Sequence, residues 1–232
     1  MKPRLLVTAG PTREPVDPVR YLSNRSSGRM GYALAAAARD AGWEVTLVSG
    51  PVHLTPPSGI RLVSVETARQ MYDAVHHTLS THSVAIFAAA VADFRPTVPS
   101  ADKIKKGQSD RFTIECERTE DILGSARSVF GFRGYLVGFA AETQNLVEHA
   151  QEKLRSKQCD LIVGNDVSRP GVGFDSLENE IILCLPGGET FPLPRDSKTA
   201  LANIIIRFIG DHATLRPDPE NPPKPPTTAP QL

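Results

Sequence analysis

The sequence predicts an α/β fold: a Rossmann-like, doubly wound, mainly parallel sheet with a C-terminal β-hairpin appendage. Short apolar runs, such as residues 5–7 and 45–48, alternate with helix-like stretches over most of the chain. This order is typical of a parallel sheet that carries helices on both faces. Two later strand-like segments follow each other directly across residues 186–188, Pro-Gly-Gly, which indicates a hairpin. We expect one domain at residues 1–213, with the hairpin at about 174–194.

The first half of the chain carries start and stop signals for two helices. Ser27 or Gly28 is placed to begin the first helix, Gly42 to end it, and Thr67 to cap the second. In chain order we expect a strand at 4–8, a helix from 27 or 28 to about 41, strands at 43–49 and 60–65, a helix from 67 to about 77 and a strand at 83–90.

The second half continues the alternation and ends in a polar tail. Residues 216–232 hold seven of the twenty prolines and almost no large apolar side chains. We therefore expect 214–232 to be a Pro-rich disordered tail. Before it we expect a loop at 93–108, a strand at 111–116, a helix at 119–129, a strand at 135–140, a helix at 144–157, a strand at 161–163, hairpin strands at 179–185 and 189–193, and a helix at 199–209 capped by Asp196 or Ser197.

Composition excludes several classes of protein. With 26 basic and 26 acidic residues the formal net charge is zero, so no global field would attract nucleic acid or an anionic membrane. No apolar run approaches the roughly 18 residues of a transmembrane helix, and the N-terminal run is too short for a signal peptide. Cys116, Cys159 and Cys184 fit neither a disulfide framework nor a zinc site. We expect a cytoplasmic protein with reduced thiols and with no nucleic-acid or membrane partner.

The connection between the first strand and the first helix is unusually long. It takes about twenty residues, rich in Pro, Gly, Ser, Arg and Asn, where a few are usual. Such a loop at the carboxyl edge of a parallel sheet is typical of a binding or catalytic segment. Residues 88–95, 139–143 and 165–166 are expected at the same edge. Because doubly wound sheets bind ligands there, we interpret the four segments as one site.

Several standard motifs are absent. The chain has no Gly-x-x-x-x-Gly-Lys-Ser/Thr phosphate loop, no compact Gly-x-Gly-x-x-Gly after the first strand and no His-Glu-x-x-His. Residues 28–31, Gly-Arg-Met-Gly, are a weaker and later echo of the glycine motif. No Tyr is followed four residues later by Lys, as a short-chain dehydrogenase would need. Composition and spacing therefore indicate only a cytosolic α/β protein with a ligand site, a nucleotide being one candidate ligand.

The residues of the long loop resemble the signature of phosphopantothenate–cysteine ligase, also called phosphopantothenoylcysteine synthetase. The loop reads GPTREPVDPVRYLSNRSSGRMG at residues 10–31. The five motifs cover roughly residues 1–170, and the remainder to about 210 fits the family in length and pattern. The four motifs that follow the loop are AAAVADFRP at 88–96, KIKK at 103–106, GFAAET at 138–143 and KxxDLIVGNDV at 157–167.

This resemblance implies a two-step reaction in coenzyme A biosynthesis. The carboxylate of 4′-phosphopantothenate attacks the α-phosphate of CTP, the nucleotide of the typical bacterial enzymes, and an acyl-cytidylate forms as pyrophosphate leaves. The amine of L-cysteine then attacks the acyl carbon, giving 4′-phosphopantothenoyl-L-cysteine and CMP. Mg²⁺ is expected to arrive bound to the triphosphate, with no metal-ligating residues assigned in the chain.

The resemblance also bears on assembly. It implies a homodimer, to which the hairpin at 179–193 could contribute an intersubunit sheet, because exposed strand edges tend to pair. In many bacteria the domain is fused behind a flavin-dependent decarboxylase, and this sequence has no such half. We therefore expect either a free-standing ligase or an excised domain, with a functional link to a separate phosphopantothenoylcysteine decarboxylase.

Lys103, Asn24 and Arg20 are the candidate catalytic residues by this resemblance. Lys103 can offset the charge that builds on the phosphates during transfer. Asn24 can donate to the substrate carboxylate or acyl oxygen, and Arg20 can bind an anion through two N–H groups. In isolation the same residues would be assigned to a solvated basic loop, an Asn turn and a surface arginine. The expected substrate-binding residues are Asn24, Arg20, Ala90, Lys105 and Lys106.

The resemblance assigns nucleotide binding to residues of the edge segments and of the helices that follow them. Asp93 can accept from the exocyclic amine of cytosine or bind a ribose hydroxyl. Lys153 and Lys157 lie four residues apart and hence on one face of a helix. Glycines suit a backbone that approaches phosphate at a helix N-terminus. The expected nucleotide-binding residues are Gly10, Ser26, Ser27, Gly28, Gly31, Phe87, Ala88, Ala89, Asp93, Lys103, Glu120, Asp121, Ile122, Leu123, Phe139, Lys153 and Lys157.

The sequence departs from the family pattern at two places and leaves alternatives open. Residues 119–121 read Thr-Glu-Asp where the family often has Asn-Pro-Asp, so Glu120 is expected to act through its backbone; Gly164 replaces a common Ala. The alternatives are an ATP-dependent form of the same ligase, an NAD(P)-dependent Rossmann oxidoreductase and a non-catalytic nucleotide-binding module. The missing glycine fingerprint argues against the oxidoreductase. The joint presence of Lys103, Asn24 and Arg20 argues against the non-catalytic module.

Overall fold

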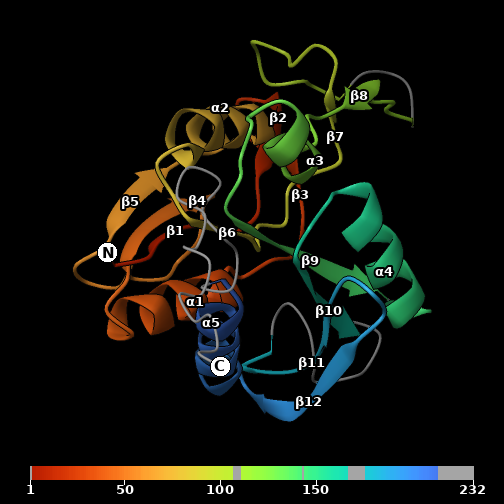
Figure 1. Ribbon diagram of the computed structural model, residues 1–232. Coiled ribbons are helices and arrows are strands. Elements are labelled where there is room, and N and C mark those ends of the chain that lie inside the picture. The colour runs from red at the N-terminus through yellow and green to blue at the C-terminus, as the bar shows by residue number, and fades with distance from the viewer. Residues whose placement is uncertain (1, 107–110, 143, 167–175, 214–232) are drawn as a thin grey trace, which may run out of the picture.

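An eight-stranded sheet organises the chain, in a computed structural model that describes residues 2–106, 111–142, 144–166 and 176–213 (Figure 1). The segment 214–232, for which the sequence predicts disorder, lies outside the described residues, as does the start of the expected hairpin region at 174–175.

Six strands of this sheet are parallel and follow the order β5-β4-β1-β6-β9-β10. The chain runs outward from β1 to β5 in one direction and from β6 to β10 in the other, so the strand order reverses between β1 and β6. The predicted doubly wound, Rossmann-like fold is confirmed, and the reversal is the point where such sheets bind ligands. The strands are β1 (Arg4–Ala9), β4 (Glu44–Ser49), β5 (Arg61–Ser64), β6 (Val84–Phe87), β9 (Tyr135–Glu142) and β10 (Leu161–Asp166).

The predicted C-terminal hairpin is present and extends the central sheet. Strand β11 (Glu178–Cys184) pairs antiparallel with β10, and β12 (Thr190–Ser197) pairs antiparallel with β11. The hairpin therefore contributes two strands to the same sheet, and β12 forms one of its edges. This edge carries Pro192 and Pro194, which have no N–H group to offer to a further strand.

Helices cover both faces of the sheet (Figure 1). Helices α1 (Arg29–Asp40) and α5 (Lys198–Ala213) pack side by side on one face. The other face carries α2 (Ala68–Leu79), α3 (Ile122–Ser128) and α4 (Leu146–Ser156). No helix within the described ranges combines the length and apolarity needed to cross a bilayer.

Buried side chains alternate between these two layers. In β1, Leu5 and Val7 pack on the α1 and α5 side, whereas Leu6 packs on the side of α2, α3 and α4. Because both faces of a parallel strand are buried, its sequence reads as a continuous apolar run. This is why residues 5–7 could be assigned to a central strand from the sequence.

The capping signals act as predicted. The Thr67 side chain accepts a hydrogen bond from the backbone N–H of Gln70 at 3.2 Å, and Gln70 Oε1 accepts one from the backbone N–H of Thr67 at 3.3 Å, which completes a capping box on α2. Gly28 is the N-cap residue of α1 and has a φ of +73°. Gly42 follows the end of that helix with a φ of +82°.

The long connection after β1 contains a hairpin that the sequence did not reveal. Strands β2 (Arg13–Asp17) and β3 (Arg20–Ser23) pair antiparallel. In the turn between them, the Asp17 carboxylate accepts hydrogen bonds from the N–H groups of Val19 and Arg20, both at 2.9 Å. The buried Glu14 carboxylate accepts from the Ala68 N–H at 2.8 Å, which docks the hairpin on the start of α2.

Two further predictions about elements were wrong. The expected loop at 93–108 contains β7 (Phe94–Pro96), and the expected strand at 111–116 is instead β8 (Cys116–Arg118). These two short strands pair with each other antiparallel. Residues 111–115 alternate apolar and polar side chains, but they pair with none of the strands that the structure describes, so the alternation alone does not produce a strand. Strand β6 also ends at Phe87, three residues before its expected end.

Candidate functional site

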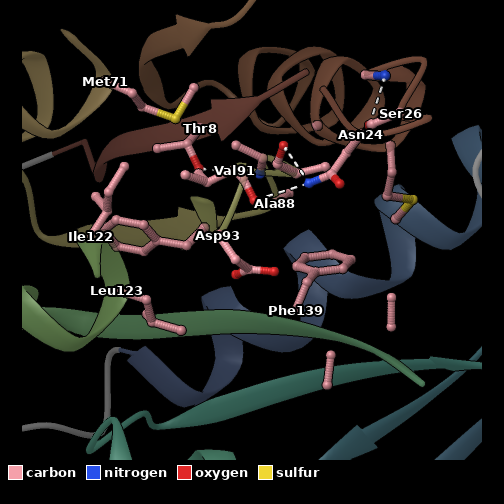
Figure 2. Close-up of a pocket in the computed structure, with 18 of the residues that line it drawn as sticks. Thr8, Asn24, Ser26, Met71, Ala88, Val91, Asp93, Ile122, Leu123 and Phe139 are labelled. Atoms are coloured by element: carbon pink, nitrogen blue, oxygen red, sulfur yellow. Dashed lines mark hydrogen bonds between the residues drawn. The ribbon is translucent and has the colours of Figure 1, made fainter. Parts of the chain in front are cut away.

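A large cavity lies at the carboxyl edge of the sheet, where β1, β6, β9 and β10 end (Figure 2). Its volume is about 1010 Å³, which is at the upper limit of the roughly 300–1,000 Å³ common for small-molecule sites. The walls come from the start of α1, the segment after β6, the start of α3, the end of β9 and one face of α4. A cavity of this size has room for more than one substrate.

The start of α1 forms one wall. Gly28 adopts the left-handed conformation, and Ser26 Oγ accepts a hydrogen bond from the Gly28 N–H at 3.3 Å. A Cβ atom on Gly31 would lie 2.5 Å from the Cβ of Ala9, so only glycine lets the helix start this close to β1. The first turn of α1 contains no acidic residue. Its free N–H groups and the positive end of the helix dipole favour an anion at this wall.

Asn24 connects the long loop to the segment after β6. Its Nδ2 donates hydrogen bonds to the carbonyl oxygens of Ala90 at 3.2 Å and Val91 at 2.9 Å (Figure 2). The same figure shows the Asp93 carboxylate and the Phe139 ring pointing into the space below Asn24. The long loop, the segment after β6 and the end of β9 therefore surround the same cavity.

The start of α3 forms the opposite wall. Asp121 caps this helix by accepting from the Gly124 N–H at 2.8 Å, and it forms an ion pair with Lys157 of α4. Burial acts to raise the pKa of Asp121, but the hydrogen bonds from Lys157 and Gly124 outweigh it and leave the pKa below its usual value. Ile122 and Leu123 follow Asp121 and offer apolar surface to a ligand.

Glu120 lines the cavity, but its carboxylate is already engaged. It accepts from Arg95 of β7 at 2.9 and 3.0 Å and from Arg69 of α2 at 2.9 Å. Burial acts to raise the pKa of Glu120, and the hydrogen bonds from Arg95 and Arg69 nevertheless lower it. The Glu120 side chain is therefore committed to the two arginines, and binding of a ligand through its backbone stays a prediction.

Lys153 is a partly buried cation of the cavity wall. Its Nζ donates to the carbonyl oxygen of Phe139 at 2.6 Å, and burial lowers the pKa of its ammonium group. Lys157 follows four residues later as the C-cap residue of α4 and binds Asp121. The two lysines share one face of α4, as their spacing predicts, and both line the cavity.

Arg20 and the lysine segment 103–106 lie apart from this cavity but are bound to each other. Arg20 donates from Nε to the Asp17 carboxylate at 3.0 Å and from Nη2 to the Ile104 carbonyl at 2.9 Å. The Ile104 N–H donates to the same Asp17 carboxylate at 3.1 Å. Because Arg20 binds it, the pKa of Asp17 is held well below its usual range. The three lysines of the segment are exposed.

The structure thus brings together most of the expected site residues. Gly10, Arg20, Lys103, Lys105 and Lys106 are the ones outside the cavity lining. Gly10 has a φ of +75° and a close approach to Gly50, so the turn itself requires glycine there. The expected residues that line the cavity are Asn24, Ser26, Ser27, Gly28, Gly31, Phe87, Ala88, Ala89, Ala90, Asp93, Glu120, Asp121, Ile122, Leu123, Phe139, Lys153 and Lys157.

Four buried polar residues of the lining had no binding role assigned from the sequence: Thr8, Asn165, Asn179 and Lys198. Of these, only Asn165 lies in a segment, 165–166, that was expected at this edge. Asn165 is the second-last residue of β10, Asn179 is the second residue of β11, and Lys198 begins α5. A sequence signal existed for Asn179, because it falls in phase with Ile181 and Leu183, which are core residues. Within the described residues, no group of three or more His, Cys, Asp or Glu side chains is placed to hold a metal ion.

Comparison with known proteins gives consistent matches. Residues 1–212 match the family described as DNA/pantothenate metabolism flavoprotein C-terminal domain. The chain is 48% identical over 206 residues to the coenzyme A biosynthesis bifunctional protein CoaBC of Vibrio vulnificus (strain YJ016), and 44% identical over 219 residues to that of Escherichia coli (strain K12). These alignments cover 88% and 94% of this chain but 51% and 53% of the relatives. The chain therefore spans about half the length of the curated relatives it matches.

A solved structure agrees over nearly its whole length. The crystal structure of the C-terminal domain of a CoaBC protein aligns with a TM-score of 0.77 at 40% sequence identity. The alignment covers 90% of this chain and 95% of that domain.

Proposed function

The chain belongs to the family of DNA/pantothenate metabolism flavoprotein C-terminal domains, and we propose that it is a phosphopantothenate–cysteine ligase of coenzyme A biosynthesis that uses CTP. The observation that carries the proposal is the cavity itself. It joins an anion-binding helix start, two lysines of α4 and Asn24 at the switch point of a doubly wound sheet. The named relatives, coenzyme A biosynthesis proteins at 44–48% identity, support the same assignment.

The proposed reaction proceeds in two substitutions. A carboxylate oxygen of 4′-phosphopantothenate forms a bond to the α-phosphorus of CTP, and the bond to the β-phosphate bridging oxygen breaks, so that pyrophosphate leaves with the electron pair. The nitrogen of cysteine then bonds to the acyl carbon, and the carbon–oxygen bond to phosphate breaks. CMP leaves with that electron pair, and the surplus amine proton passes to solvent.

The nucleotide fits the part of the cavity between the starts of α1 and α3. Ile122, Leu123 and the Phe139 ring offer apolar surface to a base, and Asp93 can accept from its exocyclic amine. The start of α1 and the ammonium groups of Lys153 and Lys157 favour the phosphates. The triphosphate would bring Mg²⁺ with it, so the ion is part of the substrate.

Asn24 and the lysine segment then serve the acyl chemistry. Asn24 already donates to two carbonyl oxygens at the cavity wall, so its amide is held where a substrate oxygen could replace one of them. Lys103 is exposed, and its segment is joined to the β2–β3 hairpin through Arg20 and Asp17. In this proposal the segment closes over the bound triphosphate and Lys103 neutralises the charge that develops there.

We also propose that the protein is cytoplasmic and that a separate decarboxylase acts on its product. The cysteines support a reducing environment, since Cys116, Cys159 and Cys184 are all free. Burial raises the pKa of the Cys159 thiol to about 12, so this thiol is a core group.

A turnover assay tests the proposal. The protein is mixed with 4′-phosphopantothenate, L-cysteine and Mg²⁺, and pyrophosphate release is measured with CTP, ATP, GTP or UTP. We expect pyrophosphate and phosphopantothenoylcysteine with CTP. Equal rates with ATP would leave the ligase assignment in place and contradict the choice of CTP. No pyrophosphate with any of the four nucleotides would contradict the ligase itself, and tight NADH binding in that case would favour the oxidoreductase.

A further inference from the structure

One end of the cavity is lined by Asn165, Asn179 and Lys198, and we call this end the amide lobe. Asn165 lies two residues after Val163, a core residue of the α1 and α5 side, so its side chain is on that face of the sheet. The lysines Lys153 and Lys157 come from α4, which covers the opposite face. The amide lobe therefore lies on the face of the sheet opposite to Lys153 and Lys157.

Asn165 has a buried oxygen without a donor. The residue is 8% exposed, and among the residues that the structure describes Oδ1 has no hydrogen-bond partner. Its neighbours in the sheet are Ala141 of β9 and Ile181 of β11, neither of which has a polar side chain to offer. Buried polar atoms are almost always paired, so a lone acceptor that lines a cavity indicates a ligand that brings an N–H or O–H group.

The other two residues supply donors. Asn179 is 2% exposed, and its Oδ1 accepts from the Glu180 N–H at 3.1 Å, so the amide nitrogen is the end that can donate to a ligand. Lys198 is 6% exposed and belongs to the same lining. The amide lobe thus combines one acceptor with donors of both neutral and charged kinds.

A triphosphate offers oxygen acceptors and no donor, so it does not match Asn165 Oδ1. An α-amino acid offers amine N–H groups and a carboxylate on the same carbon atom. We propose that the amide lobe is the subsite for the amino-acid substrate, with its amine donating to Asn165 Oδ1 and its carboxylate accepting from Asn179 and Lys198. This assignment rests on the proposed ligase function. A hydrogen bond from the amine to Asn165 would orient the nitrogen for attack on the acyl carbon.

Steady-state kinetics test the subsite in the variants Asn165→Ala, Asn165→Leu and Asn179→Ala. Because pyrophosphate leaves before cysteine reacts, its release in a single turnover without cysteine measures the first step alone. We expect that release to stay within about two-fold of wild type, while KM for cysteine rises roughly ten-fold or more. Asn203→Ala is the matched control, since Asn203 is an exposed asparagine of α5 outside the cavity.

Two kinetic results would overturn the subsite. One is an unchanged KM for cysteine in all three variants. The other is an equal or larger rise in KM for CTP or for phosphopantothenate, which would give the lobe to that substrate. Thermal unfolding of each variant shows whether it folds. If the alanine variant does not fold, Asn165→Leu replaces it, because leucine has a similar size to asparagine and no acceptor.

Direct binding separates this inference from the proposed function. Equilibrium dialysis with radiolabelled L-cysteine under reducing conditions is carried out on wild type, Asn165→Ala and Asn203→Ala. The subsite is supported if wild type binds cysteine and the Asn165 variant binds it roughly ten-fold more weakly. If the same wild-type protein turns over no nucleotide, the ligase function is contradicted while the subsite is retained. Equal binding to all three proteins, or none to wild type, overturns the subsite whatever the activity.

Discussion

Gly31 shows how one residue type decides where a helix can begin. The Cβ of any other residue would meet the Cβ of Ala9 at 2.5 Å and the Ala9 Cα at 3.1 Å. Both atoms belong to Ala9, a core residue of β1, so Ala9 cannot move away without disturbing the sheet. The position of the cavity wall at the start of α1 therefore depends on this glycine.

We predict that Gly31→Ala lowers the free energy of unfolding by about 1–3 kcal/mol, because the added methyl group overpacks the contact between α1 and β1. Urea unfolding measures the change. The matched control is Gly210→Ala in α5, where the nearest atom to a new Cβ is 3.5 Å away. There we expect a gain of about 0.5–1 kcal/mol from the higher helix propensity of alanine. A loss of similar size in both variants would contradict the steric argument.

Lys103 and Asn24 are the two candidate catalytic residues that are expected to act in different steps. Lys103→Gln should reduce pyrophosphate release at least about 100-fold, because a cation that stabilises the transferring phosphates is removed. Asn24→Asp should slow product formation and impair the handling of the intermediate, because a carboxylate cannot donate to the carbonyl oxygens of Ala90 and Val91. Rapid-quench measurement of acyl-cytidylate and product distinguishes the two effects.

Lys2→Gln and Asn203→Asp are suitable controls, since both residues are exposed and lie outside the cavity. Wild-type turnover in both Lys103→Gln and Asn24→Asp would remove these residues from the proposed site.

The β2–β3 hairpin is the element that joins the site segments to one another. Glu14 binds the start of α2, and Asp17 binds both Arg20 and the backbone of Ile104. The two carboxylates that make these contacts are buried, with Glu14 1% and Asp17 4% exposed. A connection that would otherwise be a long polar loop is thereby ordered beside the lysine segment.

We predict that Asp17→Asn destabilises the protein at neutral pH and that this difference shrinks in acid. Because the folded pKa of Asp17 is lowered, its ionised form stabilises the fold above the ordinary value of 3.8, and this stabilisation is lost as the pH falls from there toward the folded pKa. Urea unfolding of wild type and variant at several pH values measures the difference.

Asp40→Asn serves as the control, because Asp40 is exposed and pairs with the neighbouring Arg39. We expect a change of at most about 1 kcal/mol there. A difference between Asp17→Asn and wild type that stays constant down to the acid transition would contradict the role given to the Asp17 charge.

At the level of the whole molecule, the strand order places the cavity. The chain winds outward in both directions from β1 and β6, which leaves the crevice between their carboxyl ends uncovered by any crossover. Several exposed apolar side chains belong to the β2–β3 hairpin and to the segments next to β7 and β8. Val19 and Tyr21 of the β2–β3 hairpin region, Val98 after β7 and Phe112 before β8 are exposed by 49–83%. Phe112 and Arg20 face each other at 5.7 Å.

The homodimer expected from the sequence stays a prediction, and these exposed side chains suggest where to test it. We predict a dimer by light scattering and its dissociation by Tyr21→Glu, because a charge would be buried in an apolar contact. Phe191→Glu on β12 is the matched control, and we expect it to remain dimeric because the prolines of that edge hinder strand pairing. A monomeric wild type contradicts the dimer, and dissociation by Phe191→Glu alone would return the interface to the hairpin.

The residue pattern of the chain was sufficient for the order of the main strands and helices, for the capping of α2 by Thr67 and for most of the cavity lining. These features depend on neighbours a few residues apart, and on motifs whose residues can be compared with a family one by one. Long-range contacts decided the rest. Strands β7 and β8 form only because they pair with each other. The hydrogen bonds of Asp17 stabilise the β2–β3 hairpin, which could not be predicted from the sequence.

Asn165, Asn179 and Lys198 gather in one lobe only when β10, β11 and α5 are packed. Which polar groups become buried together, and which of them lack a partner, is a property of tertiary packing, because burial and hydrogen bonding are set by segments distant in the chain.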